Sequence, residues 1–260
     1  MSHRDDALRD LDGARILDAM RWAARSAAAR TLADFSEAAG HDARWLGLTR
    51  HILLEDRLDR VFSLGRYYVP EGADAATGMD VVVAELTQED IASMPVIPPG
   101  TVKRANIQGS PGWTTGKHHF LIQSFQPGEV DEIRWERKSE TKQEVARQPN
   151  PDAPALLEIP PAMRPVPIIN VALDAPVLVL AHSLNPINGS SELYLGLPSI
   201  TLEHDGSWHW RHALHDQRPS GPGAQIPTPN HPASPNDVPD APVRLRDQKP
   251  GRESLEEERA

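Results

Sequence analysis

The chain has 260 residues, and none of them is cysteine. This absence excludes disulfide frameworks, zinc sites built on thiolates and cysteine nucleophiles, and it suits a reducing compartment. No stretch approaches the roughly 18 consecutive apolar residues that a membrane-spanning helix needs, and no apolar segment follows the charged N-terminus as in a secretory leader. We therefore expect a cytoplasmic protein that does not associate with membranes.

Positive charge is in deficit, since the formal net charge is −10 and the pI is near 5.5. The field of such a molecule repels nucleic acid and anionic membranes, which argues against broad, non-specific binding to either. We expect a protein partner rather than nucleic acid, although a local basic patch could bind an anion. With 39% hydrophobic and 25% charged residues, the chain is globular in composition and long enough for one substantial domain or two small ones.

Residues 1–62 have the pattern of a helical hairpin. Apolar residues recur at spacings of three and four through a stretch without proline or glycine, at Ile16, Met20, Ala23, Ala27, Ala28, Leu32 and Phe35. This predicts a long helix over residues 14–39, which Gly40 would end by taking the left-handed conformation common at helix ends. Asp42 is placed to cap a second helix that continues to Phe62.

Beyond Tyr67 the pattern changes to short runs rich in β-branched residues, separated by proline and glycine. We predict strands at residues 80–86, 101–107, 118–125, 132–137, 168–173, 177–181, 192–197 and 208–214. The run 177–181 is apolar throughout, which predicts a position at the centre of a sheet. Prolines are dense over 149–167, which we interpret as a surface connector within one domain.

The predicted fold class is therefore α+β. An N-terminal helical hairpin packs on a mainly antiparallel β-sheet or sandwich formed by residues 63–216. Residues 217–260 are rich in proline and contain no aromatic residue. Such a segment cannot bury enough surface to offset its ordering entropy of roughly 1 to 2 kcal/mol per residue, so we predict a disordered C-terminal tail.

One triplet has the residue types of a nuclease site. Glu136, Arg137 and Lys138 follow Asp131, and metal-dependent nucleases of the PD-(D/E)xK class use two carboxylates to hold magnesium and a lysine to position the attacking water. The spacing is unfavourable, because Asp131 and Glu136 would lie on opposite faces of one strand. A solvated, charged strand end is the alternative interpretation.

The surrounding residues 101–148 are locally basic, with two interleaved tryptophans. Cationic and aromatic side chains together could bind a ligand by stacking and charge, and the candidates are Arg104, Trp113, Lys117, His119 and Trp135. Acidic residues in the same stretch nearly cancel its charge, so an ordinary mixed-charge surface is the competing interpretation.

Histidines are densest in residues 204–216. If the end of this stretch were helical, His209, His212 and His215 could bind zinc or iron, with Asp216 as a further ligand. The residues favour a strand, however, on which Trp208, Trp210, His212 and Leu214 would face one way and His209 and His215 the other. Three histidines would then meet only across a bend.

Other catalytic and binding patterns have less support. Ser183 follows His182, but the flanking glycines of a nucleophile elbow are absent, and no phosphate-binding loop or dinucleotide fingerprint occurs. Two helices separated by Gly40 also match the start of a helix-turn-helix motif, in which Arg44, Arg50 and His51 would be the possible DNA contacts. Packing or dimerisation explains these helices better, because acidic residues follow at once.

The sequence contains no complete catalytic set. We therefore expect a non-enzymatic binding or accessory protein without a cofactor, whose tail is suited to docking a partner. The alternative is a metal-dependent hydrolase acting on nucleic acid, through Glu136 and Lys138 or through the histidines, and only this alternative requires a divalent metal.

Overall fold

A computed structural model of the protein describes residues 2–68, 80–153, 176–200 and 206–214. These residues belong to a unit spanning residues 1–221, whereas the second unit, 222–260, and with it most of the predicted tail, lies outside the described residues. The longer helices are α1 (His3–Gly13), α2 (Ile16–Asp34), α3 (Ala43–Val61), α5 (Gln88–Ser93) and α6 (Glu140–Ala146). Short 3-10 segments are η1 (Glu37–Ala39), η2 (Gly65–Tyr67), η3 (Val130–Glu132) and η4 (Trp135–Arg137).

Helices α2 and α3 pack against each other, as the apolar spacing predicts. Asp42 caps α3, because its carboxylate accepts hydrogen bonds from the backbone N–H groups of Arg44 and Trp45, each at 2.9 Å. The helix predicted over residues 14–39 corresponds to α2, which is shorter. It begins only after Arg15, whose left-handed conformation separates α1 from α2. Helix α2 also ends before Gly40, which closes only the following segment η1.

Six strands form a single sheet in the order β1-β2-β3-β4-β5-β6. They are β1 (Lys103–Arg104), β2 (Gly112–Thr114), β3 (His119–Ser124), β4 (Val177–Leu184), β5 (Ser191–Pro198) and β6 (Trp208–Ala213). All neighbours are antiparallel except β3 and β4, which run parallel. Every residue of β4 is buried, which confirms the central position predicted from its apolar sequence. The α+β fold class is therefore correct.

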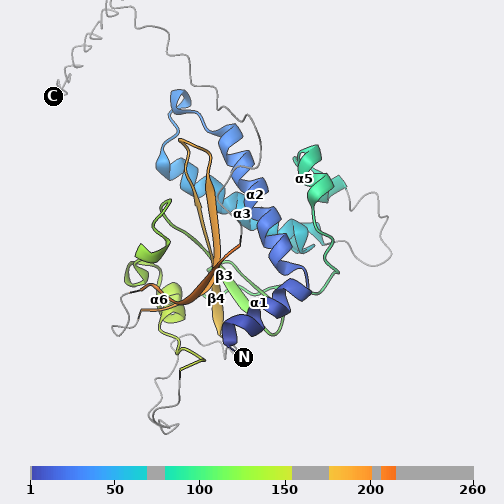
Figure 1. Ribbon diagram of the computed structural model, residues 1–260. Coiled ribbons are helices and arrows are strands. Elements are labelled where there is room, and N and C mark those ends of the chain that lie inside the picture. Colours follow the sequence, from blue (N-terminus) through green and yellow to red (C-terminus); the bar gives the residue numbers. More distant parts are fainter. Residues whose placement is uncertain (1, 69–79, 154–175, 201–205, 215–260) are drawn as a thin grey trace, which may run out of the picture. The chain divides into compact units, whose positions relative to one another are not determined.

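The sheet separates two hydrophobic cores. On one face, residues such as Phe120, Leu178 and Leu195 pack against α1, α2 and α3. On the other face, Val179 and its neighbours pack against the segment that contains η3, η4 and α6. Figure 1 shows α2 and α3 beside one face of the sheet and α6 on the opposite side.

Several predicted strands are absent or shorter. Residues 80–83 are helical, where a strand was expected, and the expected strand 101–107 pairs regularly only at β1. The expected strand 132–137 is replaced by η3 and η4, because the hydroxyl of Ser207 donates to the carbonyls of Asp131 and Ile133 and removes them from strand pairing. The expected strand 168–173 and most of the connector 149–167 lie outside the described residues.

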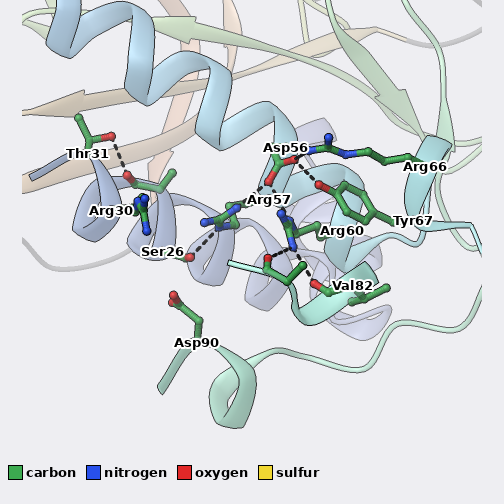
Figure 2. A network of polar contacts seen from close by, with 12 residues as sticks. Ser26, Arg30, Thr31, Asp56, Arg57, Arg60, Arg66, Tyr67, Val82 and Asp90 are labelled. Atoms are coloured by element: carbon green, nitrogen blue, oxygen red, sulfur yellow. Dashed lines mark hydrogen bonds and ion pairs between the residues drawn. The ribbon is translucent and has the colours of Figure 1, made fainter. Parts of the chain in front are cut away.

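A buried ion network fixes α3 to the segment that follows it (Figure 2). Asp56 accepts hydrogen bonds from Arg57 at 2.6 Å and from Arg60 at 2.8 Å, and it is also bonded to Arg66 and Tyr67. Burial acts to raise the pKa of Asp56, but the hydrogen bonds from Tyr67, Arg60 and Arg66 and the charge of Arg60 outweigh it and lower this pKa to about 2. Arg60 in turn donates to the backbone carbonyls of residues 82 and 84, which holds residues 80–84 in a turn.

Within the described residues, no helix is both long and apolar enough to cross a membrane.

Candidate functional site: a cationic pocket at the ends of two parallel strands

A pocket of about 470 Å³ lies where the carboxyl ends of β3 and β4 meet the first half of α3. Parallel strands end at the same edge of a sheet, so the residues that follow them converge there. The wall combines α3, the last residues of β3 and β4 with those that follow them, and the residue after η4: Ala43, Leu46, Gly47, Arg50, Ser124, Phe125, Gln126, Pro127, Lys138, Leu184, Asn185 and Pro186.

Arg50 is the main polar group of the pocket wall. Arg50 is only 5% exposed, and within the described residues its guanidinium makes one long hydrogen bond, from Nη2 to the backbone oxygen of His182 at 3.3 Å. The Nε atom is buried without a hydrogen-bond partner, and no carboxylate in the described part of the chain pairs with Arg50. Burial therefore lowers the pKa of Arg50 from 12.5 to about 10. The residue stays positively charged at neutral pH.

Two histidines, His182 and His51, lie close to Arg50. His182 is buried near the end of β4, and both of its ring nitrogens lack a hydrogen-bond partner within the described structure. The ring of His51, on α3, lies 5.7 Å from the ring of His182. Burial lowers the pKa of His182 well below 6.5 and that of His51 to about 4, with smaller contributions from the nearby positive charges. Both rings are neutral at physiological pH.

Two lysines add positive charge from the opposite side of the sheet. Lys138 follows η4 and lines the pocket, and Lys142 lies one turn further along, on α6. Burial, and then the charge of Lys138, lower the pKa of Lys142 to about 8. Lys142 also acts electrostatically on His51 and His182. The pocket is therefore surrounded by several groups of one sign.

A carboxylate on the neighbouring strand β5, that of Glu192, has other hydrogen bonds. Glu192 and Ser183 are register partners on β5 and β4, and the Ser183 hydroxyl donates to Glu192 Oε2 at 2.7 Å. The same oxygen accepts from the backbone N–H of Gly128, also at 2.7 Å. A smaller cavity between α2, α3 and β4 is lined by both Arg50 and Glu192, yet the two do not form an ion pair.

No protein-family model, curated protein or solved structure matches this chain. Function is therefore inferred from the chemistry of the pocket. Its wall offers hydrogen-bond donors and positive charge beside apolar surface from Leu46, Phe125 and Leu184. Such a combination can hold a small molecule with an anionic end.

The structure separates the three residues of the nuclease-like set. Asp131 lies in η3, where its carboxylate receives two hydrogen bonds from Arg211 of β6, at 2.7 and 2.6 Å. Glu136 is exposed in η4. Lys138 alone lines the pocket. The three residues therefore do not lie on one strand, as the sequence pattern had suggested.

The five predicted ligand-binding residues also divide between structural roles. The guanidinium of Arg104 lies 4.5 Å above the ring of Trp113, which is fully buried and donates to Asp59 at 2.9 Å. Trp135 is buried in the other core and donates to the backbone oxygen of residue 207. Lys117 is exposed beside Asp10.

His119 is the fifth of these residues. It begins β3, where burial lowers its pKa. The tryptophans Trp113 and Trp135 lie in the cores on opposite faces of the sheet, so they do not form a common stacking surface.

The histidine-rich strand β6 is irregular. His209 lies 3.2 Å from the backbone oxygen of Gln148, and His212 lies further along the strand, where burial lowers its pKa. His215 and Asp216 lie outside the described residues. In the described part of the chain, no group of three or more histidine or acidic residues has the geometry to hold a metal ion.

The sequence-based expectation for the tryptophans of β6 is wrong. A register shift between Leu197 and Pro198 places Trp208 in the core with Trp135, whereas Trp210 packs against the helical core. A bulge of this kind reverses the alternation of side chains along a strand.

Sequence reasoning missed the position of Arg50 in the pocket wall and considered this residue only as a DNA contact. Arg50 is buried and therefore does not present its charge to a duplex. One pattern could have revealed it, because Arg50 occurs four residues after Leu46 and four before Leu54, within the buried stripe of α3. His182 likewise follows directly after the apolar residues of β4. A charged or titratable residue at a buried position without a paired partner is a candidate functional residue.

Proposed function

We propose that this protein is a non-enzymatic binding protein that holds a small molecule in the pocket between α3 and the carboxyl ends of β3 and β4. The observation that supports the proposal is Arg50, a buried cation in the wall of a 470 Å³ pocket that has no paired carboxylate among the residues that the structure describes. Known small-molecule sites have volumes of roughly 300 to 1,000 Å³ and combine apolar walls with a few convergent polar groups.

Binding is favoured over catalysis by the surroundings of the candidate acids. Asp131 is engaged by Arg211, and Glu136 is exposed in a different turn. His51 and His182 could move protons in principle, but both are neutral and neither is hydrogen-bonded to a nucleophilic side chain in the described structure. We accordingly expect no nuclease activity with magnesium.

We also propose a cytoplasmic location and a protein partner rather than nucleic acid. The basis is the composition, with no cysteine and a net charge of −10. In such a protein the pocket would carry the ligand and an outer surface would contact the partner.

Gly47 provides a direct test of the pocket. It lines the pocket on α3, and a Cβ atom added there would meet no atom within 4 Å. Gly47→Phe should therefore fill the pocket, whereas Gly47→Ala is a matched control that adds only a methyl group. A thermal-shift screen with a library of small metabolites is expected to find compounds that stabilise the wild type and Gly47→Ala but not Gly47→Phe.

The contrary outcome is equally clear. If no compound distinguishes the wild type from Gly47→Phe, or if the same compounds stabilise both, the pocket is not a binding site. Magnesium-dependent cleavage of DNA or RNA that is lost in Glu136→Gln would instead support the hydrolase.

A further inference from the structure

The pocket has a marked excess of positive charge at one end. Arg50 and Lys138 line it, and Lys142 lies close enough to influence Lys138 and the two histidines. Two cationic groups therefore line the pocket and a third lies near it, and none of the three forms an ion pair with a carboxylate in the described residues. Cations are rarely buried without a partner, because the loss of hydration is compensated only by an anion.

The unused hydrogen-bond donors belong to the most buried of these groups. Among the described residues, Arg50 Nε is buried with no partner, and Nη2 makes only the 3.3 Å contact to the His182 carbonyl. That carbonyl already accepts from the backbone N–H of Phe125 at 3.1 Å, so it does not require Arg50. A guanidinium presents its donors as a planar fork that matches two oxygens of one anion.

The charge count distinguishes between oxyanions. A carboxylate would neutralise one of the surrounding charges, whereas a phosphate monoester carries nearly two negative charges at neutral pH. Neutral donors at the strand ends, Gln126, Asn185 and Ser124, can supply further hydrogen bonds to its oxygens.

The rest of the pocket is apolar. Leu46, Phe125, Leu184 and two prolines form the remaining wall, and the volume exceeds that of a phosphate group alone. A wall that is cationic in one part and apolar in another predicts a ligand with an anionic group and an apolar body.

We propose that the pocket binds a small phosphomonoester, with its phosphate between Arg50 and Lys138 and its apolar body against Leu46, Phe125 and Leu184. This inference rests on the proposed function and adds the chemical class of the ligand.

The test uses the full chain and three probes: inorganic phosphate, phenyl phosphate and benzoate. Binding is measured by isothermal titration calorimetry in a buffer without phosphate, at constant ionic strength. We expect phenyl phosphate to bind most tightly, inorganic phosphate more weakly and benzoate weakest.

Three variants locate the binding. Arg50→Met and Lys138→Gln should each weaken phenyl phosphate roughly tenfold or more, because each removes a charged donor. Lys103→Gln removes the same charge from an exposed position of β1 and should leave binding unchanged. Circular dichroism verifies that each variant is folded, and Lys138→Gln alone suffices if Arg50→Met does not fold.

The outcomes separate the two proposals. Loss of affinity in Lys138→Gln but not in Lys103→Gln would support the phosphate site. The phosphate inference is overturned if benzoate binds more tightly than phenyl phosphate, or if Lys103→Gln weakens binding as much as Lys138→Gln. If no phosphate binds while neutral compounds still bind in a manner sensitive to Gly47→Phe, the inference fails and the binding function stands. If nothing binds in the pocket, both fail.

Discussion

Two buried arginines on α3 should respond in opposite ways to the same substitution. Arg50 and Arg57 are seven residues apart, and they are 5% and 2% exposed. Burial lowers the pKa of both guanidinium groups. Arg57, however, donates to Asp56 at 2.6 Å and to Ser26 at 2.9 Å, whereas Arg50 has no carboxylate partner in the described ranges of the chain. Replacement by methionine keeps a long side chain in each position and removes the charge.

The expected magnitude follows from the cost of burying the charge. A fall in the pKa of Arg50 from 12.5 to about 10 corresponds to roughly 3 kcal/mol against the charged form. Replacing Arg50 by methionine removes this cost, but it also removes the 3.3 Å hydrogen bond to the His182 carbonyl, which offsets part of the stability gained. The carbonyl oxygen keeps its hydrogen bond from the N–H of Phe125. We therefore expect Arg50→Met to raise the free energy of unfolding by about 1 to 2 kcal/mol. Arg57→Met should lower it by about 2 to 4 kcal/mol, since it leaves Ser26 and one bond of Asp56 unsatisfied.

The assay is urea denaturation at pH 7.5 followed by circular dichroism, with linear extrapolation and a comparison of the slopes. For a domain of this size, the gain in Arg50→Met corresponds to a rise in Tm of roughly 2 to 8 °C. A gain in stability together with a loss of ligand binding is the behaviour of a functional residue rather than a structural one. If Arg50→Met destabilises the protein as much as Arg57→Met does, the reasoning that Arg50 is uncompensated is refuted.

Three further predictions concern the ion network, pH and close packing. Asp56→Asn should cost about 3 to 5 kcal/mol, because it removes the counter-charge of buried arginines. Asp34→Asn, which breaks an exposed pair, should cost about 0.5 kcal/mol or less in the same urea experiment; equal effects would contradict the importance of burial. The pKa of His51 is about 4 in the folded state against an ordinary 6.5, so the unfolded chain binds more protons in this interval. The contribution of His51 to the free energy of unfolding should therefore be fully present above pH 6.5 and be lost as the pH decreases toward 4. His51→Gln should reduce this slope in urea midpoints measured from pH 7.5 to 4.5, and an unchanged slope would exclude His51 as a contributor. A Cβ at Gly196 would lie 2.6 Å from a backbone oxygen, so Gly196→Ala should lower stability by about 1 to 3 kcal/mol. Gly47→Ala, with open space and a helical position, should raise it by up to about 1 kcal/mol, and thermal unfolding of both variants checks the contrast.

Local chemistry made some of the fold predictable. Asp42 caps α3 as expected, because the bonds from its carboxylate reach only two and three residues along the chain. The apolar run at 177–181 indicates a central strand, because only a strand covered on both faces excludes polar side chains from both.

Other elements depend on partners distant in the sequence. Residues 132–137 have the alternation of a strand. The hydroxyl of Ser207, however, donates to the backbone oxygens of Asp131 and Ile133, which strand pairing would require. Residues 81–83 are three valines with β-branched side chains, yet Arg60 donates to the carbonyls of residues 82 and 84 and favours a turn. Intrinsic strand propensity is weak, so one or two such hydrogen bonds override it.

By itself the sequence determined the fold class, the paired helices, the central strands and the absence of thiol chemistry, because these follow from periodicity, composition and short-range capping. Only the tertiary structure decided which polar residues matter. Lys138 was identified as one member of a catalytic triplet, but in the fold Asp131 is bonded to Arg211 and Lys138 lines the pocket of Arg50. Residues 50, 138 and 182 are far apart along the chain, and their convergence depends on the parallel pairing of β3 with β4. That long-range pairing leaves no mark in the spacing of the residues, and the pocket forms only when the sheet does.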